Sequence, residues 1–277
     1  NYTTASTTIP TYGSGYFDGT GDYLTFASTT ASVGSTSAWT IETWVYPTAT
    51  PGTAGWINAD VISGTSYAIS ISYRSSNNLE IYFKTSGGTT FGLTTTSAQT
   101  VPLNTWTHIA VVKSSTNALV YFNGVLTNTI SLSSNVIGTG TVNYIGYESP
   151  AGASSYYFTG YISNFRIVKG TALYTANFYP SPTPLTAVTN TSLLTLQYNG
   201  GSNDSQFQDT SNLQTLITRA GNATQGTVSP FSATGWSGYF DGTGDYLSFP
   251  SNAAFTLGTG DFTIEAWIYP MNSSGTQ

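Results

Sequence analysis

Two aspartates in a glycine-rich turn are the first candidates for site chemistry. Asp18 and Asp22 flank Gly19-Thr20-Gly21, and the same pair returns further along the chain as Asp241 and Asp245. Carboxylates are oxygen ligands of the kind that calcium prefers, so the turn is a candidate calcium site. Aspartates in such turns also accept hydrogen bonds from their own backbone amides, and calcium needs about six to eight oxygens. Both interpretations, calcium or a hydrogen-bonded turn without metal, stay open, and no other cofactor is expected.

Aromatic residues and polar side chains in or beside predicted loops are candidates for sugar binding. Flat rings can cover the C–H faces of a neutral sugar, while amides or carboxylates bond its hydroxyls. The alternative is that these rings only cap the ends of a domain, because apolar surface is common on all proteins. The candidate residues are Trp56, Tyr67, Asn77, Asn78, Tyr147, Glu148, Tyr156 and Tyr157.

Residues that could carry catalysis are few. Retaining glycosidases need two carboxylates about 5 Å apart, and acids on one strand face stand two residues apart. Glu42 has Thr40 and Trp44 at those positions, so no acid pair forms there. His108, the single histidine, lies within a predicted strand, and the chain has no cysteine. We interpret Glu42 and His108 as packed or hydrogen-bonded structural side chains and expect no enzyme activity.

The composition of the chain excludes several classes of function. Only 6% of the residues are charged, against about 25% in typical proteins, while 14% are aromatic. Such a content of aromatic residues can bury a large core, which is incompatible with disorder. The six basic residues are scattered and the net charge is −6, so the sequence has no basic patch for nucleic acid. No run of about eighteen apolar residues is present, so no membrane insertion is expected.

The residue pattern predicts strands rather than helices. Short alternating runs rich in Val, Ile, Thr, Tyr and Phe are separated by Gly, Ser, Asn and Pro. Asn123-Gly124 predicts a β-hairpin, because both turn positions tolerate positive φ. Ile41, Thr43 and Val45 share one strand face and are expected in the core. The predicted fold is all-β, an antiparallel two-sheet jelly-roll sandwich, with one helical turn near Thr171–Phe178.

A long-range repeat sets the domain organisation. Residues 14–26 return at 237–249 with twelve of thirteen positions identical, and only Thr25 against Ser248 differs. The same offset of 223 residues aligns Trp39–Pro47 with Phe262–Pro270. A repeat of this length is a whole domain with its connection rather than a solenoid unit. We predict one domain at residues 1–186, without its opening strands, and an incomplete second copy at 187–277.

The segment before the second copy is itself predicted to contain strands. Leu193–Tyr198 and Gln214–Thr218 are interpreted as opening strands of the second copy. By the repeat offset Asn1 corresponds to Thr224, so the first copy is expected to leave a sheet edge open. Pairing of Leu193–Tyr198 with the first copy would close that edge and favour assembly by strand exchange. Pairing of Leu193–Tyr198 only within the second copy would exclude assembly by strand exchange.

These pieces stand in the order of a known family. They resemble the laminin-G-like or concanavalin A-like jelly rolls, which are related to pentraxins, over most of residues 14–186. A second, narrower resemblance joins Gly160–Tyr174 and Pro182–Leu185 to the version common in large proteins of marine bacteriophages. The matching pieces are Phe17-Asp18-Gly19, Asp22-Tyr23-Leu24, Trp39–Pro47, Trp106–Val111, Val120–Gly124 and Gly160–Ile167.

The resemblance implies a non-enzymatic structural or attachment protein of a virion, such as a tail fibre, spike or decoration protein. Its repeats would engage host-surface glycans from the virion surface, and its other partners would be virion proteins or copies of itself. Two alternatives stay open. The first is a purely structural spacer or filament component, and the second is a module of an extracellular adhesin on a bacterial cell surface.

Overall fold

The computed structural model divides the chain into two compact units, Asn1–Gly235 and Trp236–Gln277. Each unit is described by itself. The described residues of the first unit are 12–27, 32–34, 36–63, 66–85, 90–94, 100–132, 136–148, 156–197 and 205–231. Those of the second unit are 240, 243–244, 246–248, 250–251, 255–266 and 268.

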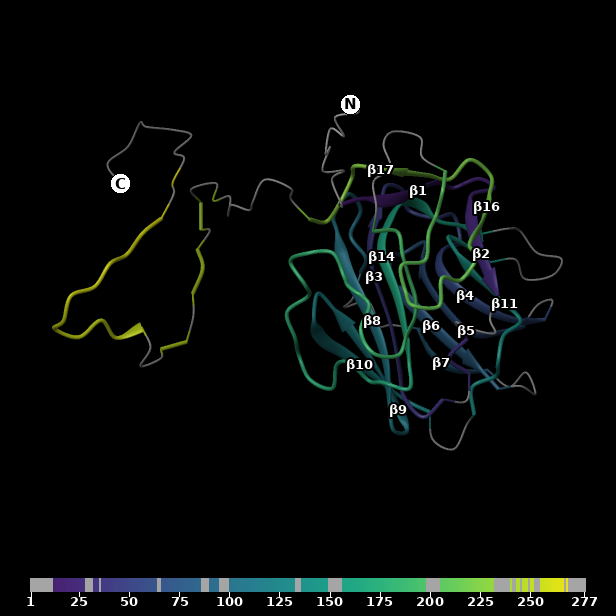
Figure 1. Ribbon diagram of the computed structural model, residues 1–277, viewed down its shortest axis with the longest axis horizontal. Helices are drawn as coiled ribbons and strands as arrows, with labels where there is room; N and C mark the ends of the chain where they lie inside the picture. Colours follow the sequence, from purple (N-terminus) through teal and green to yellow (C-terminus); the bar gives the residue numbers. More distant parts are fainter. Residues whose placement is uncertain are drawn as a thin grey trace, which may run out of the picture. The chain divides into compact units, whose positions relative to one another are not determined.

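The first unit is a sandwich of two antiparallel sheets, which are seen beside each other in Figure 1. The first, sheet A, has eight strands, and β15 joins it by pairing with β14. In spatial order its other strands are β10 (Val125–Ser131), β9 (Asn117–Phe122), β8 (Thr107–Ser114), β3 (Trp39–Pro47), β14 (Thr159–Lys169), β1 (Ser14–Asp18) and β17 (Thr224–Gly226), and β15 is Thr191–Thr195.

The second, sheet B, has seven strands, and a separate two-stranded ribbon is formed by β12 (Tyr147–Glu148) and β13 (Tyr156–Tyr157). The strands of sheet B are β16 (Thr218–Ala220), β2 (Tyr23–Ala27), β11 (Val142–Ile145), β4 (Ala54–Ser63), β5 (Ser66–Arg74), β6 (Leu79–Lys84) and β7 (Thr90–Thr94). Since the described residues contain no α-helix, the predicted all-β sandwich is confirmed.

The core lies between the two sheets, as strand alternation predicts. Ile41 and Val45 of β3 are fully buried in it, and Ile69 and Ile71 of β5 meet them from sheet B. Its largest buried side chains are aromatic, with Trp39 on sheet A among them. Burying such large rings supplies the hydrophobic stabilisation of a chain that has few charges.

Two local predictions have opposite outcomes. The Asn123-Gly124 hairpin is confirmed, since the pair joins β9 to β10 with φ of 47° and 79°. The prediction of a helical turn near Thr171–Phe178 is wrong, because the segment is irregular there, with a bend and no helix. Its aromatic side chains pack instead on Tyr121 of β9, so burial against sheet A outweighs a single isolated helical turn.

The segment Thr191–Phe231, here called the linking segment, pairs with the first unit. β15 pairs with β14, β16 with β2, and β17 with β1. Figure 1 shows β16 and β17 beside β2 and β1. The strand predicted at Leu193–Tyr198 is present in its first part as β15, which ends at Thr195 and pairs with the first copy, and Tyr198 lies outside the described residues. The strand predicted at Gln214–Thr218 begins only at Thr218. The first compact unit consequently runs to Gly235 rather than ending at residue 186.

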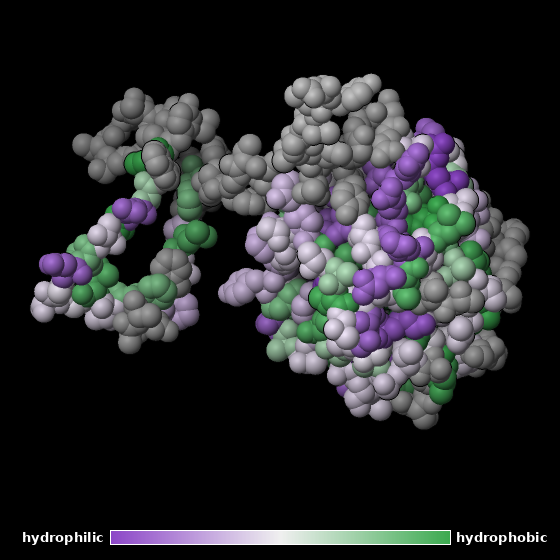
Figure 2. All heavy atoms as spheres, in the orientation of Figure 1, coloured by the Kyte–Doolittle hydropathy of each residue, from purple (hydrophilic) through white to green (hydrophobic). Residues whose placement is uncertain are grey.

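The surface of the first unit reflects the low charge of the chain. In Figure 2 pale, weakly polar residues predominate on its visible face, with strongly hydrophilic residues in smaller groups. The described part of the second unit carries no strand, and Phe262, Ile264 and Ile268 are exposed there. Within the described ranges no helix is long and apolar enough to cross a membrane.

Replacing Leu193 by Ala tests how far the linking segment stabilises the first unit. Leu193 is fully buried in the core, so Leu193→Ala should lower the free energy of unfolding by about 2–5 kcal/mol in urea titrations. Leu213 in the same segment is 52% exposed, and Leu213→Ala should change that free energy by less than about 0.5 kcal/mol. Equal small effects from both variants would contradict the docking of this segment.

Candidate functional site

The outer side of sheet B, turned away from the core, carries a continuous group of aromatic side chains. Alternation places them there, since Ile69 and Ile71 of β5 face the core while Ser70 lies opposite Tyr82 on the other side. Trp56 lies on the same side, in a cluster separate from the core. The aromatic face, as we call it, consists of Tyr23, Trp56, Tyr67, Tyr82, Tyr144, Tyr147, Tyr156 and Tyr157.

A stack of tyrosine rings forms one half of the aromatic face. The ring of Tyr147 packs on those of Tyr23 and Tyr157, with centroid distances of 4.6 and 4.8 Å, and the latter two rings are 6.5 Å apart. Tyr144 meets Tyr147 edge-on at 5.4 Å. Burial and the neighbouring Tyr147 and Tyr157 raise the pKa of Tyr23. Its hydroxyl therefore stays a neutral donor and acceptor near pH 7.

Trp56 and Tyr67 form the other half. Their ring centroids are 5.8 Å apart, and Tyr82 lies 6.4 Å beyond Tyr67. The Nζ atom of Lys84 lies 4.4 Å from the centroid of the Tyr67 ring, a cation–π contact. Burial, followed by the charge of Glu148, raises the pKa of Tyr67 to about 12. Tyr144 and Tyr156 pack on the Trp56 cluster and thereby join the two halves.

Glu148 of β12 is a carboxylate that lies among these aromatic side chains. Its residue is only 2% exposed, and burial raises the pKa of Glu148 to about 7, although Lys84 and Arg74 oppose the shift. A carboxyl group with this pKa is present near neutral pH both as an acid that donates and as an acceptor. The second carboxylate of the face, Glu80, is held in an ion pair by Arg74 at 2.6 Å.

Three buried polar atoms of the face have no hydrogen-bond partner among the described residues. They are Trp56 Nε1, Ser70 Oγ and Ser72 Oγ. The ladder pairs Trp56 with Ser72, and both serines lie on strand β5 next to each other on one side. Buried polar groups without partners are rare in proteins and call for a water or ligand to satisfy them.

An open hollow of about 300 Å³ borders the aromatic face. It is lined by Tyr156 and Tyr157 of β13, by the β3–β4 loop from Thr50 to Ala54, and by Gly19 and Thr159. Aromatic walls with backbone and hydroxyl groups nearby are typical of small-molecule sites.

The structure brings together six of the eight residues that the sequence nominated for sugar binding. Trp56, Tyr67, Tyr147, Glu148, Tyr156 and Tyr157 lie on or in the aromatic face.

The other two lie at the β5–β6 turn. Asn77 has a φ of 60°, and its carbonyl accepts a hydrogen bond from Val101 N. Asn78 forms a β-bridge with Thr100. Both asparagines therefore have structural roles in this turn.

Sequence reasoning missed Tyr23, Tyr82, Tyr144 and Lys84 because they lie within strands rather than loops. Tyr82 alternates with buried Ile81 and Phe83, and Tyr144 with buried Asn143 and Ile145. This parity along the strands was the signal that could have found them.

The candidate calcium turn is satisfied by backbone amides. Asp18 Oδ1 accepts from Thr20 N at 2.7 Å, and Asp22 Oδ2 accepts from Asp18 N at 3.0 Å. The other oxygen of Asp22 accepts from Asn222 N at 2.6 Å. Among the described residues no group of three acidic, histidine or cysteine side chains could hold a metal, so the residues present do not fit calcium. Asp241 and Asp245 lie outside the described residues.

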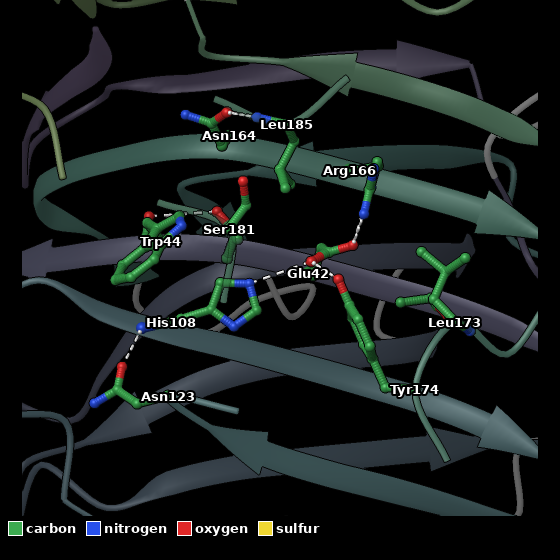
Figure 3. Close-up of polar contacts among 12 residues, drawn as sticks. Glu42, Trp44, His108, Asn123, Asn164, Arg166, Leu173, Tyr174, Ser181 and Leu185 are labelled. Carbon is green, nitrogen blue, oxygen red and sulfur yellow. Dashed lines mark hydrogen bonds and ion pairs between the residues drawn. The ribbon is translucent and has the colours of Figure 1, made fainter. Parts of the chain in front are cut away.

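On the outer side of sheet A, Glu42 is the centre of a buried polar cluster. Figure 3 shows Arg166, His108 and Tyr174 converging on Glu42. Arg166 donates to Glu42 Oε1 from Nε at 2.9 Å and from Nη2 at 2.5 Å. His108 Nε2 and the Tyr174 hydroxyl donate to Oε2 at 3.2 and 2.9 Å. The prediction that Glu42 and His108 are hydrogen-bonded structural residues is confirmed.

The electrostatics of this cluster keep Glu42 ionised. Burial alone would raise the pKa of Glu42, but the His108 hydrogen bond and the Arg166 charge outweigh it and hold that pKa below its usual value. Arg166 also donates to the carbonyl of Thr186 at 2.8 Å. The segment after β14 thus covers the cluster, which leaves Glu42 without access to a substrate.

A sequence profile described as the concanavalin A-like lectin/glucanases superfamily matches residues 18–176. This span exceeds half of the chain. The chain belongs to this superfamily. Its members share the sandwich described above, and the lectin-like fold suggests glycan binding.

Several solved structures are similar to the chain. A Bacteroides ovatus protein, named for a proposed carbohydrate-binding role, is 16% identical with a TM-score of 0.55, covering 80% of this chain and 61% of its own. A heptameric pentraxin from Limulus polyphemus is 19% identical with a TM-score of 0.44, covering 59% of this chain and 78% of its own. The mouse laminin α1 LG4-5 domains are 14% identical with a TM-score of 0.43, covering 61% of this chain and 47% of theirs.

The chain therefore spans less than two thirds of the Bacteroides protein. No curated protein sequence matches the chain.

Glu148 predicts a specific pH dependence of stability. With a folded pKa raised to about 7 from 4.5, the folded chain binds more protons than the unfolded chain between these pH values. The free energy of unfolding of the wild type should therefore fall, relative to Glu148→Gln, as pH rises from 4.5 to 8, by roughly 1–3 kcal/mol. Parallel profiles of the two proteins in urea titrations at each pH would contradict this account of Glu148.

Glu42→Gln should be strongly destabilising. The substitution leaves the buried Arg166 charge without its counter-ion, which costs about 3–5 kcal/mol of unfolding free energy. Tyr174→Phe is the matched control, because it removes one neutral donor to the same carboxylate and should cost about 1 kcal/mol. Similar losses from both variants in chemical denaturation would contradict a dominant role for the ion pair.

Proposed function

We propose that this protein is a non-enzymatic glycan-binding attachment protein and that the aromatic face is its binding surface. One observation carries the proposal. The rings of Tyr147, Tyr156 and Tyr157 are only partly buried, and those of Tyr156 and Tyr157 line the open hollow. Accessible rings supply the stacking contacts of a neutral sugar, and the loop from Thr50 to Ala54 supplies polar groups for its hydroxyls.

The charges of the face suit a neutral or weakly charged glycan. Glu80 and Arg74 neutralise each other, and Lys84 lies over the ring of Tyr67. Glu148 is almost fully buried, and burial raises its pKa to about 7, so it adds little negative charge to the face near neutral pH. The hollow beside Tyr156 and Tyr157 has the size of a small ligand site and offers loop backbone for further hydrogen bonds.

Binding is favoured over hydrolysis by the state of the two carboxylates. A retaining hydrolase needs a free nucleophilic carboxylate about 5 Å from its acid partner. Glu80 is ion-paired with Arg74, and both Glu80 and Glu148 are almost fully buried. The proposal is therefore a lectin-type site without catalysis.

The virion assignment rests on the resemblance of Gly160–Tyr174 to large proteins of marine bacteriophages. In a fibre, spike or decoration protein on the virion surface, weak sites repeated along a chain bind host-surface glycans with useful avidity. The repeat of residues 14–26 at 237–249 supports such an array. A structural spacer would show no glycan affinity, and flanking sequence would identify a bacterial adhesin by its anchor.

A glycan array probed with the 277-residue chain tests the proposal. Tyr156→Ala, which removes a ring at the hollow, should weaken binding of the positive glycans by about two- to tenfold, the equivalent of one ring contact of about 0.5–1.5 kcal/mol. Tyr179→Ala is the matched control, because Tyr179 is fully exposed and outside the aromatic face, and it should bind as the wild type does.

Repeating the array with a chelator tests whether glycan binding requires calcium. Since Asp18 and Asp22 are occupied by backbone amides, glycan binding should survive chelation. Loss of binding on chelation would instead support a calcium site. A folded chain that binds no glycan, with or without calcium, would contradict the attachment role and favour the spacer.

A further inference from the structure

The linking segment, Thr191–Phe231, is built into both sheets of the first unit. In sheet A, β15 pairs with β14 through Arg166–Leu194 and Ile167–Leu193, and Leu193, Leu194 and Leu196 are fully buried. The carbonyl of Leu196 accepts hydrogen bonds from Asn164 N and from Ser163 Oγ of β14. These contacts make β15 an integral strand rather than a surface attachment.

A buried aspartate fixes the turn that follows β15. Asp209 Oδ1 accepts from Leu194 N at 3.0 Å and from Ser211 N at 2.8 Å. Its Oδ2 accepts from Thr215 N at 2.7 Å. One carboxylate thus joins the strand to the chain that leads toward β16, and Phe207 beside it is buried in the common core.

β16 and β17 then each cover one edge of a sheet. β16 pairs with β2 of sheet B, and β17 with β1 of sheet A. At the turn between them, Asn222 N donates to the fully buried Asp22. Gly221 has a φ of 66°, and a Cβ there would overlap Asp22 Oδ1, so the turn is fitted to the first copy. Ala223 is buried in the core beside it.

The same segment directly precedes a second, nearly identical set of acceptor strands. Residues 237–249 repeat β1, the Gly-rich turn and β2, including Asp245 at the position of Asp22. β16 therefore has two acceptors of nearly the same chemistry, Thr25 in the first copy and Ser248 in the second. In the structure β16 pairs with the first of these acceptors, Thr25 of β2.

Chain connectivity favours the first copy as acceptor. β15 follows β14 through residues 169–190, and this connection is docked, since Lys169 N donates to Asn190 O and Gly170 N to Ala38 O. The strand equivalent to β14 in a following copy would stand 223 residues further along the chain by the repeat offset. Closing the shorter loop costs less conformational entropy.

The geometry points to strand donation between consecutive repeats: the segment that leads into one repeat completes the sheets of the repeat before it. The partner of the segment is thus the preceding copy of the same jelly roll, and the segment is not a free linker. This inference does not depend on glycan binding.

Engineered disulfides test strand donation in the 277-residue chain, which has no native cysteine. Thr218 lies directly opposite Thr25, at a separation that a disulfide can bridge. In the triple variant Thr25→Cys, Thr218→Cys, Ser248→Cys, the cysteine at 218 can choose between equivalent positions of the two copies. Peptide mapping after mild oxidation should find 25–218 within one chain, at least tenfold in excess of 218–248.

Each other outcome overturns the inference. A predominant 218–248 link would assign the segment to the second copy. A 25–218 link between two chains would indicate exchange between molecules instead of donation along one chain. The absence of any link to position 218, in a variant with the wild-type circular dichroism spectrum, would contradict the pairing of β16 with β2.

A longer chain tests whether β16 pairs with the first copy only because the second copy lacks most of its strands. Appending residues 48–231 after Pro270, the counterpart of Pro47, supplies the second copy with its remaining strands. Strand donation predicts that the first occurrence of position 218 still links to 25 in this chain. A switch to 248 would contradict it, while glycan binding measured on the same protein would test the proposed function separately.

Discussion

The buried ion pair between Glu42 and Arg166 is the constraint on which the arrangement of sheet A depends. Two opposite charges out of water are tolerated only when their geometry is good and further hydrogen bonds surround the pair. Here that requires β3, β14 and β8 in one register, with His108 and Tyr174 donating to the carboxylate and Thr186 accepting from Arg166. The segment after β14 must therefore lie over the outer side of sheet A.

Because of this cover, the outer sides of the two sheets differ in how far they are buried. The outer side of sheet A is closed by Tyr174, Phe178 and the residues that follow them. The outer side of sheet B keeps its tyrosines only partly buried, with Tyr147, Tyr156 and Tyr157 on the two-stranded ribbon, while Trp56 is buried among them. A chain with few charges thus places a neutral ligand surface on one sheet while it stabilises the other with a charged pair.

Strand parity and turn chemistry made much of the fold predictable from sequence. Ile41 and Val45 were assigned to the core from alternation, and Asn123-Gly124 to a hairpin from its tolerance of positive φ. β4 was missed because Gly55, Asn58 and Asp60 disfavour strands by composition, although burial between neighbours holds them in one. Which copy pairs with Thr191–Thr195 could not be predicted, since repeated acceptor sequences are equivalent until the chain is folded.

The candidate site was predictable only in part for the same reason. Loop aromatics such as Tyr156 and Tyr157 attract attention in a sequence, whereas Tyr23 and Tyr144 look like ordinary strand residues. Only the pairing of β2 with β11 brings the latter two beside Tyr147. The raised pKa of Glu148 likewise depends on burial that no local pattern encodes.

The most direct test of the central claim is to follow the tryptophan indole N–H signals by NMR during titration with a glycan that the array identifies. Trp56 Nε1 is an unpartnered donor of the aromatic face, whereas Trp39 lies in the core between the sheets. With assignment by Trp56→Phe, the account predicts a saturable shift of the Trp56 signal and an unchanged Trp39 signal. Saturable binding that leaves Trp56 unshifted and moves the signal of Trp44 or Trp106 on the sheet A side would contradict it.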